Sequence, residues 1–357
     1  MAVSLSSFLT DLITHEGPIP LDHYMGLCVS HYYDTRDPLG ADGDFITAPE
    51  ISQIFGELIG LWVAQIWLDM GDPQHVQWVE LGPGRGTLSA DALRAVKSVP
   101  GFHDNLSVHL IETSRTLKAK QQENLKDYNV SWYTTLNEFL DKTPENPVFF
   151  IANEFFDALP VKQFIRKKHF WHERMIGLRG NDLVFGLSHE PARHISIEAP
   201  PGTILEQSPV SQHYAADIAE ALQKRDGAAL FIDYGYWGPL FGDTLQALKQ
   251  HHPVSPLEEP GTVDLTAHVD FQVLAEQAVK NHVPVYGLAT QRDFLKNLGI
   301  DLRAEMLMKQ ADDETKRTIE TSIARLTESG SKGMGNLFKV LCFTSPSISG
   351  IPALNPL

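Results

Sequence analysis

The chain has 357 residues, of which 43% are hydrophobic and 21% are charged, and its formal net charge is −16. This length suits one large α/β domain with insertions or two domains, and the composition is typical of a globular protein with a sizeable core. The acidic balance argues against general binding of nucleic acids or anionic membranes; it fits a basic partner or solubility alone. The two cysteines, Cys28 and Cys342, are too few and too far apart to predict a disulfide framework or a cysteine-rich zinc site.

The first 75 residues are predicted to form a helical cap. Their start has no basic region, and Asp11 interrupts its apolar run, so it does not resemble a secretory signal. Apolar residues recur at helical spacing in residues 4–15 and 21–30, and a third helix is expected from about residue 51 to residue 70. Charged and polar residues within that third helix favour a buried or amphipathic helix over a membrane span.

From residue 77 strands alternate with helices, which predicts a parallel sheet covered by helices. Residues 76–160 would form the first half of this domain, and residues 211–357 the remainder with a helical insertion. Expected strands are 77–81, 108–111, 130–133, 148–152, 228–234, 283–288 and 337–343; expected helices are 88–99, 116–125, 211–224 and 271–280, with a helical stretch at 290–329.

Residues 161–210 break this alternation, because short strands flank a turn at Gly180 and Asn181. We interpret them as an inserted antiparallel β unit. The predicted fold class is therefore α/β: a doubly wound sheet with a helical cap at its N-terminus and an inserted β unit.

The segment Glu80-Leu-Gly-Pro-Gly-Arg-Gly-Thr follows an expected strand and opens an expected helix. Gly82, Gly84 and Gly86 would let backbone N–H groups approach a ligand closely. The spacing GxGxG differs from the GxGxxG of dinucleotide-binding loops, and no P-loop sequence is present. An acid beside the loop repels a pyrophosphate but suits a cationic ligand such as S-adenosylmethionine, which carries an ammonium and a sulfonium. The alternative is a glycine-rich turn with no ligand.

Further acids follow the second and fourth expected strands of the sheet. Glu112 directly follows the expected strand 108–111, where this class of fold binds ribose hydroxyls. The alternative is a solvated strand end. Asn153, Glu154 and Asp157 follow residues 148–152, and ligands of open α/β sheets lie at such carboxyl ends. Two carboxylates there could grip a guanidinium and accept its proton; the alternative is a helix N-cap or a surface turn.

With these motifs the sequence resembles the MidA-like methyltransferases, relatives of the mitochondrial methyltransferase that assists respiratory complex I assembly. The segments that carry the resemblance span nearly the whole chain: GDFITAPEISQIFGE (43–57), ELGPGRGT (80–87), NEFFDALPV (153–161), DYGY (233–236), DLTAHVDF (264–271), TQRDFL (290–295) and MGNLFKV (334–340). Arg292 and Asp293 depart from the pattern, in which a small residue follows Thr290 and Gln291.

The resemblance implies a seven-stranded class I methyltransferase fold and the cofactor S-adenosyl-L-methionine. It further implies methyl transfer to an arginine of a protein substrate, which in the mitochondrial members is a complex I subunit. Because the arginines of a transit peptide are missing, we expect a bacterial cytoplasmic member. The acidic charge predicts no nucleic-acid partner, and the polar residues of the third helix predict no membrane span. Homodimerisation is left open.

The resemblance also favours a lid at residues 43–50, which would place Asp44, Thr47 and Glu50 over the cofactor; the alternative is a capping segment for the following helix. Tyr234, at the end of residues 228–234, would line the acceptor channel or close the core.

The segment from Asp264 to Asp270 supplies the remaining candidates. His268 would act as a base or clamp the substrate, with Asp264 and Asp270 beside it, unless the segment only caps a helix. The histidines have no metal-ligand spacing, so no metal is expected.

Three other functions compete with arginine methylation: an assembly chaperone that binds cofactor and partner without turnover, a small-molecule methyltransferase, and a dehydrogenase. Binding without methyl transfer would indicate the first, and the size of the cap and insertion argues against the second. Failure to bind nicotinamide would exclude the third.

Overall fold

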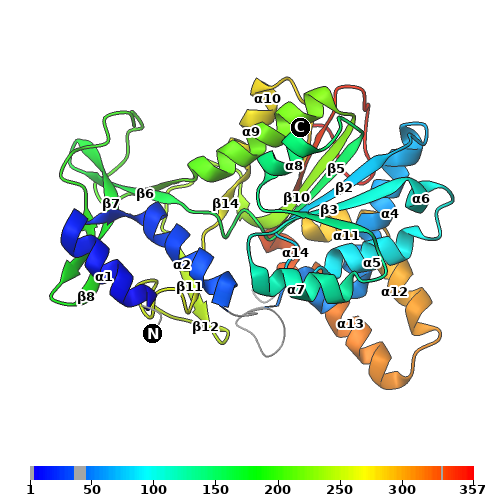
Figure 1. The fold of residues 1–357 in the computed structure, drawn as a ribbon, viewed down its shortest axis with the longest axis horizontal. Coiled ribbons are helices and arrows are strands. Elements are labelled where there is room, and N and C mark those ends of the chain that lie inside the picture. The colour runs from blue at the N-terminus through cyan, green and yellow to red at the C-terminus, as the bar shows by residue number, and fades with distance from the viewer. Residues whose placement is uncertain (1–3, 36–45, 331–332) are drawn as a thin grey trace. The chain divides into compact units, whose positions relative to one another are not determined.

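The computed structural model describes residues 4–35, 46–330 and 333–357, which form two compact units (Figure 1). Of the described residues, 4–35, 157–213 and 238–268 form the first unit, and 46–156, 214–237, 269–330 and 333–357 form the second. Helices α3 and α4 thus group with the large sheet, whereas residues 1–75 were expected to form one cap. The described helices do not include one that combines the length and apolarity needed to cross a membrane.

The second unit is built on one mixed sheet whose strand order is β15-β16-β10-β5-β2-β3-β4, with β14 beside β10. Strands β4, β3, β2, β5 and β10 are parallel, while β16 is antiparallel to both of its neighbours. This confirms the doubly wound sheet with an antiparallel edge hairpin. The strands are β2 (Val76–Leu81), β3 (Leu106–Ile111), β4 (Val130–Tyr133), β5 (Val148–Asn153), β10 (Gly227–Tyr236), β14 (Val269–Asp270), β15 (Val285–Thr290) and β16 (Phe338–Thr344).

The central strands are buried on both faces. All six residues of β2 and of β5 are buried, as expected for parallel strands covered by helices on each side. Trp78 packs into the cluster under α4 and α5, whereas Phe150 contacts Phe139 of α8 on the other face. The helices of this unit are α3 (Ala48–Ile51), α4 (Gln53–Asp69), α5 (Thr87–Val96), α6 (Phe102–Asn105), α7 (Arg115–Asn124), α8 (Leu136–Lys142), α10 (Phe271–Lys280), α11 (Gln291–Asn297), α12 (Ile300–Met308), α13 (Asp313–Thr327) and α14 (Met334–Leu337), together with most of α9 (Pro209–Lys224).

Helix α4 packs closely against α5 because it presents glycines at the contact. A Cβ atom at Gly60 would lie 2.8 Å from the Cα atom of Ala92, and one at Gly56 would lie 2.8 Å from the Cβ atom of Asp91. Both approaches are shorter than side chains tolerate, so only glycine permits this helix spacing.

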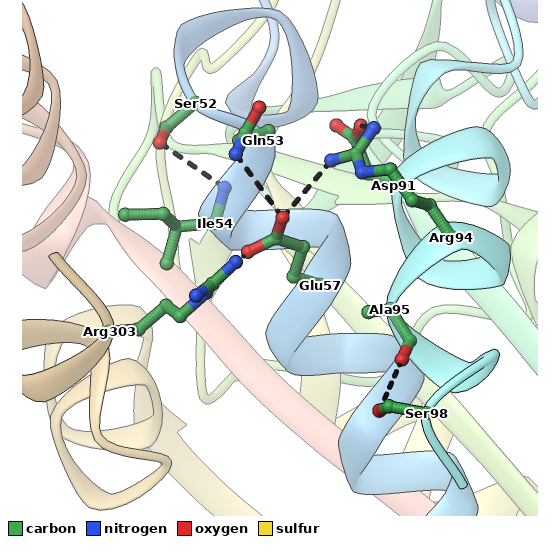
Figure 2. Close-up of polar contacts among 9 residues, drawn as sticks. All are labelled: Ser52, Gln53, Ile54, Glu57, Asp91, Arg94, Ala95, Ser98 and Arg303. Atoms are coloured by element: carbon green, nitrogen blue, oxygen red, sulfur yellow. Dashed lines mark hydrogen bonds and ion pairs between the residues drawn. The ribbon is translucent and has the colours of Figure 1, made fainter. Parts of the chain in front are cut away.

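A buried carboxylate fixes the same helices (Figure 2). Glu57 of α4 accepts hydrogen bonds from Arg94 of α5 at 3.1 Å and from Arg303 of α12 at 2.8 Å. Only 4% of its side chain is exposed. The two guanidinium groups compensate the buried charge and tie the helical insertion to the core of the unit.

The first unit contains the inserted β unit, which confirms the antiparallel hairpins expected at residues 161–210. Strands β6 and β7 pair with each other, β7 pairs with β8, and β6 pairs with β9. Two features were not predicted: β1 joins this sheet, and a second, three-stranded sheet forms. The elements are α1 (Leu5–Glu16), β1 (Ile19–Pro20), α2 (Leu21–Thr35), β6 (Lys162–Lys167), β7 (Phe170–Arg179), β8 (Asp182–Leu187), β9 (Ile204–Gln207), β11 (Gln246–Lys249), β12 (His252–Pro253) and β13 (Asp264–Thr266).

Candidate functional site

The candidate site lies within the second unit, where the strand order of the sheet reverses. From β2 the chain proceeds to β3 and β4 on one side, and it then returns to β5 and β10 on the other side. Two loops therefore leave the carboxyl ends of the adjacent strands β2 and β5 in opposite directions. Open α/β sheets bind their ligands at such a switch point.

The glycine loop at residues 82–86 turns sharply between β2 and α5. Gly82, Gly84 and Gly86 have φ values of +60°, +54° and +80°, which side chains rarely adopt. A Cβ atom at Gly82 would also lie 2.8 Å from a ring carbon of Phe155. The loop thus needs glycine for its backbone and for its close packing, and it leads directly into the N-terminus of α5.

Glu80 lies at the carboxyl end of β2, and only 3% of the residue is exposed. It accepts a hydrogen bond from the hydroxyl of Ser89, which also accepts one from the indole N–H of Trp78 at 2.9 Å. Burial raises the pKa of Glu80 from 4.5 to about 8, and the nearby charge of Glu112 adds to this effect. Neutral Glu80 is therefore favoured below pH 8 until a cation compensates its charge.

Glu112 follows β3 and is held by two donors. Its Oε1 atom accepts the backbone N–H of Ser114 at 2.7 Å, and its Oε2 atom accepts the amide of Gln121 at 2.9 Å. The same amide nitrogen donates to the carbonyl of Gly84 at 2.7 Å. Gln121, which sequence reasoning did not identify, thereby joins the glycine loop to Glu112. Its spacing of four residues from both Leu117 and Leu125 was the one signal that it faces the core.

Asn153 ends β5 beside the glycine loop, and Glu154 directly follows the strand. Asn153 is 8% exposed, and its buried Oδ1 atom accepts no hydrogen bond from any residue that the structure describes. Such an acceptor costs free energy unless a ligand or water donates to it. Glu154 adopts a left-handed backbone with φ of +49°, which places it among the strained residues that cluster at functional sites.

The short helix α3 is attached to both loops of the site. The Oε1 atom of Glu154 accepts the backbone N–H of Ala48 at 2.8 Å and the amide of Asn153 at 3.3 Å. Glu50 accepts the hydroxyl of Thr87 and pairs with Arg85 at 3.5 Å. The carboxylates of Glu154 and Glu50 therefore hold the start and the middle of α3 against the switch point.

Residues 43–50 were interpreted either as a lid over the cofactor or as a capping segment for the following helix, and their described part leads into α3. Thr47 is the N-cap residue, and Pro49 lies in the first turn, but the Thr47 side chain makes no capping hydrogen bond. Instead the carboxylate of Glu154 takes the first N–H group of the helix. Asp44 lies outside the described residues.

The end of β10 supplies further polar groups. Asp233 is buried, and its carboxylate accepts the backbone N–H of Phe156 at 3.0 Å, which fixes the loop after β5. The ring of Tyr234 packs edge-to-face on Phe338, with ring centroids 5.4 Å apart. Asp270 caps α10 by accepting the N–H groups of Gln272 and Val273, so the capping interpretation of this residue is confirmed.

Three predicted residues belong to the first unit instead. The backbone carbonyl of Asp157 accepts the N–H of Ala267 at 2.9 Å, and Asp264 is buried in β13. His268 lies beside Gln246, with 3.3 Å between their side-chain nitrogens, and its burial lowers its pKa. A lowered pKa keeps the imidazole neutral, which is the form that accepts a proton. The roles of these residues in catalysis stay predictions.

The departure at residues 292–293 has a local structural explanation. Thr290 caps α11, because its side-chain oxygen accepts the backbone N–H of Asp293, and its hydroxyl donates to the carboxylate of Asp293 at 2.8 Å. Arg292 donates to the carbonyl of Thr327 at 3.1 Å and so connects α11 to the end of α13.

Comparisons with known proteins agree with this geometry. Residues 58–289 match the model of a family described as "Putative S-adenosyl-L-methionine-dependent methyltransferase". The mitochondrial protein arginine methyltransferase NDUFAF7 of Danio rerio is 35% identical over 348 residues, which cover 87% of this chain and 80% of that protein. The homolog from Drosophila melanogaster is 34% identical, with 95% and 84% covered.

A solved structure is similar over nearly its full length. A superfamily member from Burkholderia thailandensis, crystallised with bound S-adenosyl-homocysteine, superposes with a TM-score of 0.83 at 27% identity. The match covers 98% of this chain and 93% of that one. The architecture described above is thus shared with a protein that holds the demethylated form of the cofactor.

Proposed function

This chain belongs to the family of S-adenosylmethionine-dependent methyltransferases that its residues 58–289 match, and from that premise we propose that it methylates an arginine side chain of a protein. The cofactor supplies a methyl group on a sulfonium, which is already a good leaving group. The task of the protein is therefore to bind, orient and desolvate the reacting groups.

We assign the cofactor to the loops at the switch point. Gly82, Gly84 and Gly86 would let the cofactor approach the loop backbone closely, because they lack side chains; the N–H groups of Gly82 and Gly86 themselves donate to the carbonyls of Ile111 and Pro83. Glu112 would bind the ribose hydroxyls. The Oδ1 atom of Asn153 supports this assignment, because it is a buried acceptor that needs a donor such as the cofactor's ammonium or amino group. Glu80 would lie under the loop, where its charge becomes favourable once a cation is bound.

The acceptor assignment rests on Glu154. Its carboxylate lies at the carboxyl end of β5, next to Asn153, on a left-handed backbone that the surrounding structure must impose. A carboxylate can orient a guanidinium by charge-assisted hydrogen bonds and take the proton that the nitrogen loses when it bonds to the methyl carbon. Relatives named protein arginine methyltransferase, which are 33–36% identical, support the choice of arginine.

The single observation that carries the proposal is the convergence of three carboxylates with a glycine loop and a buried unsatisfied amide at one sheet edge. Glu112 and Glu154 make the site negative, and Glu80 adds its charge once a cation is bound. Such a site suits a cationic cofactor and a cationic acceptor and disfavours a pyrophosphate. Because the sequence resembles relatives of the methyltransferase that assists complex I assembly, we further propose a protein acceptor related to respiratory complex I.

The test begins with the cofactor. Isothermal titration of the purified protein with S-adenosylmethionine should give micromolar binding that Gly84→Val abolishes, because valine cannot adopt φ of +54° without strain. An absence of binding in the wild-type protein would remove every role assigned above.

The second stage identifies the acceptor. The protein is incubated with methyl-labelled S-adenosylmethionine and a heat-treated bacterial extract, with Gly84→Val as the blank. Labelled proteins are then hydrolysed to amino acids. Label in methylarginine supports the proposal, whereas label in another amino acid or a small molecule contradicts it. Tight cofactor binding and partner capture without any transfer would instead indicate an assembly chaperone.

A further inference from the structure

Gln121 is a buried side chain at the edge of the proposed cofactor site whose amide contacts three separate elements. Its Nε2 atom lies 2.7 Å from the carbonyl oxygen of Gly84 and 2.9 Å from Oε2 of Glu112. Its Oε1 atom accepts the indole N–H of Trp132 in β4 at 2.9 Å. The residue is 0% exposed, so water does not compete for these bonds.

The orientation of this amide is fixed by Trp132. An indole N–H can only donate, so it must face the side-chain oxygen of Gln121. Both amide hydrogens are then directed at the two acceptors, Gly84 and Glu112. A flipped amide would place donor against donor at Trp132 and acceptor against acceptor at the other two positions.

The glycine loop needs such an anchor. Three of its five residues are glycines with positive φ, and a backbone of this kind has many accessible conformations. Helix α7 restricts it at two carbonyls: Gln121 binds that of Gly84, and Asn124 binds that of Arg85 at 2.9 Å. The α carbon of Gln121 also packs 3.6 Å from where a Cβ atom of Gly86 would lie.

The same amide determines how Glu112 presents its carboxylate. One oxygen is engaged by the backbone of Ser114 and the other by Gln121, so the plane of the carboxylate cannot rotate. A carboxylate held in this way binds two adjacent hydroxyls without losing further conformational entropy.

We propose that Gln121 is a positioning residue of this methyltransferase: it sets the glycine loop and the ribose-binding carboxylate in one relative geometry before the cofactor binds. The inference rests on the cofactor site proposed above. It predicts that Gln121 acts mainly on recognition of the ribose hydroxyls, although its own amide has no hydrogen-bonding group left to donate to the ligand.

The experiment compares four proteins by isothermal titration with S-adenosylhomocysteine and with its 2′-deoxyribose analogue. Gln121→Met keeps the size of the side chain but removes the amide, and Trp132→Phe removes only the donor that orients it. Gln122→Met is the matched control, since Gln122 is exposed on the same helix.

We expect Gln121→Met to bind S-adenosylhomocysteine at least tenfold more weakly than wild type, which corresponds to the loss of a hydrogen bond to a charged group. Its preference for the ribose over the deoxyribose ligand should shrink as well. Trp132→Phe should bind S-adenosylhomocysteine about threefold more weakly than wild type. This variant keeps the test decisive if Gln121→Met does not fold. Gln122→Met should match wild type.

If Gln121→Met and Trp132→Phe each lose the same affinity for both ligands, Gln121 only stabilises the fold, and the inference is overturned. Binding within twofold of wild type in both variants would also overturn it. Failure of the wild-type protein to bind S-adenosylhomocysteine is a different result, because it removes the proposed cofactor site itself.

Discussion

Glu154 has a structural role at α3 and a proposed role in binding the acceptor, and substitutions can separate the two. Its Oε1 atom accepts the backbone N–H of Ala48, a residue that is 0% exposed, and its charge would orient the arginine acceptor. Glu154→Gln keeps an oxygen for Ala48 but removes the charge. Glu154→Ala removes both. The two variants retain a Cβ atom on the same left-handed backbone, so the strain at φ of +49° is common to them.

The magnitudes differ accordingly. Glu154→Gln replaces a charge-assisted hydrogen bond by a neutral one and should lower the free energy of unfolding by about 1 kcal/mol or less. Glu154→Ala leaves the N–H of Ala48 without its acceptor and should lower it by about 1–3 kcal/mol. Loss of the carboxylate should reduce methyl transfer by a factor of about 10² or more in both variants.

The assays are denaturant unfolding, titration with S-adenosylmethionine and transfer of labelled methyl to the acceptor fraction. Glu154→Gln should bind the cofactor within about threefold of wild type while transfer is lost, a factor worth less than 1 kcal/mol. Near-normal transfer by Glu154→Gln would refute the role of the charge. An equal loss of cofactor binding and transfer would show that Glu154 serves the cofactor site instead of the acceptor.

Three further predictions follow from buried groups of the second unit. The pKa of Glu80 is about 8 in the folded protein against an ordinary value of 4.5, so the free energy of unfolding of the ligand-free wild type should fall as pH rises from about 5 to about 8. Glu80→Gln should remove this pH dependence in denaturation experiments; the same pH dependence in the variant would contradict the raised pKa. Gly60→Ala should lower the melting temperature despite the helix propensity of alanine, because its Cβ atom would lie 2.8 Å from Ala92; a higher melting temperature would refute the close packing. Glu57→Ala should lower the free energy of unfolding by about 2–4 kcal/mol in chemical denaturation, somewhat less than for a fully buried pair because both arginine partners are partly exposed. A loss in the range of surface ion pairs, about 0–1 kcal/mol, would show that solvent already screens the network.

Most elements of the second unit could be predicted from the sequence because their apolar patterns are strong. Strands 130–133 and helix 271–280 have the predicted bounds, and β5 extends only one residue beyond its prediction. The helical stretch 290–329 divides into α11, α12 and α13. The first division lies at Gly299, the N-cap residue of α12, which adopts φ of +86°. Such a division depends on a single backbone conformation that composition does not reveal.

The small sheets of the first unit were less predictable. Strand β1 has two residues, and β12 and β13 have two and three. Segments this short have no recognisable periodicity, and they become strands only because partners distant in the sequence supply hydrogen bonds. Ile19 pairs with Ile176 in this way, across more than 150 residues.

The sequence by itself determined the glycine loop, the acids at the ends of the strands and the class of ligand they suit, because each depends on residue type and on position relative to a strand. Only the tertiary structure decided which of these groups share a site. Glu154 holds α3 to the end of β5, Glu50 holds it to the glycine loop, Gln121 joins that loop to Glu112, and Asp270 caps a helix. These pairings connect residues up to 106 positions apart. They follow from the order of strands and the packing of helices, which no local pattern encodes.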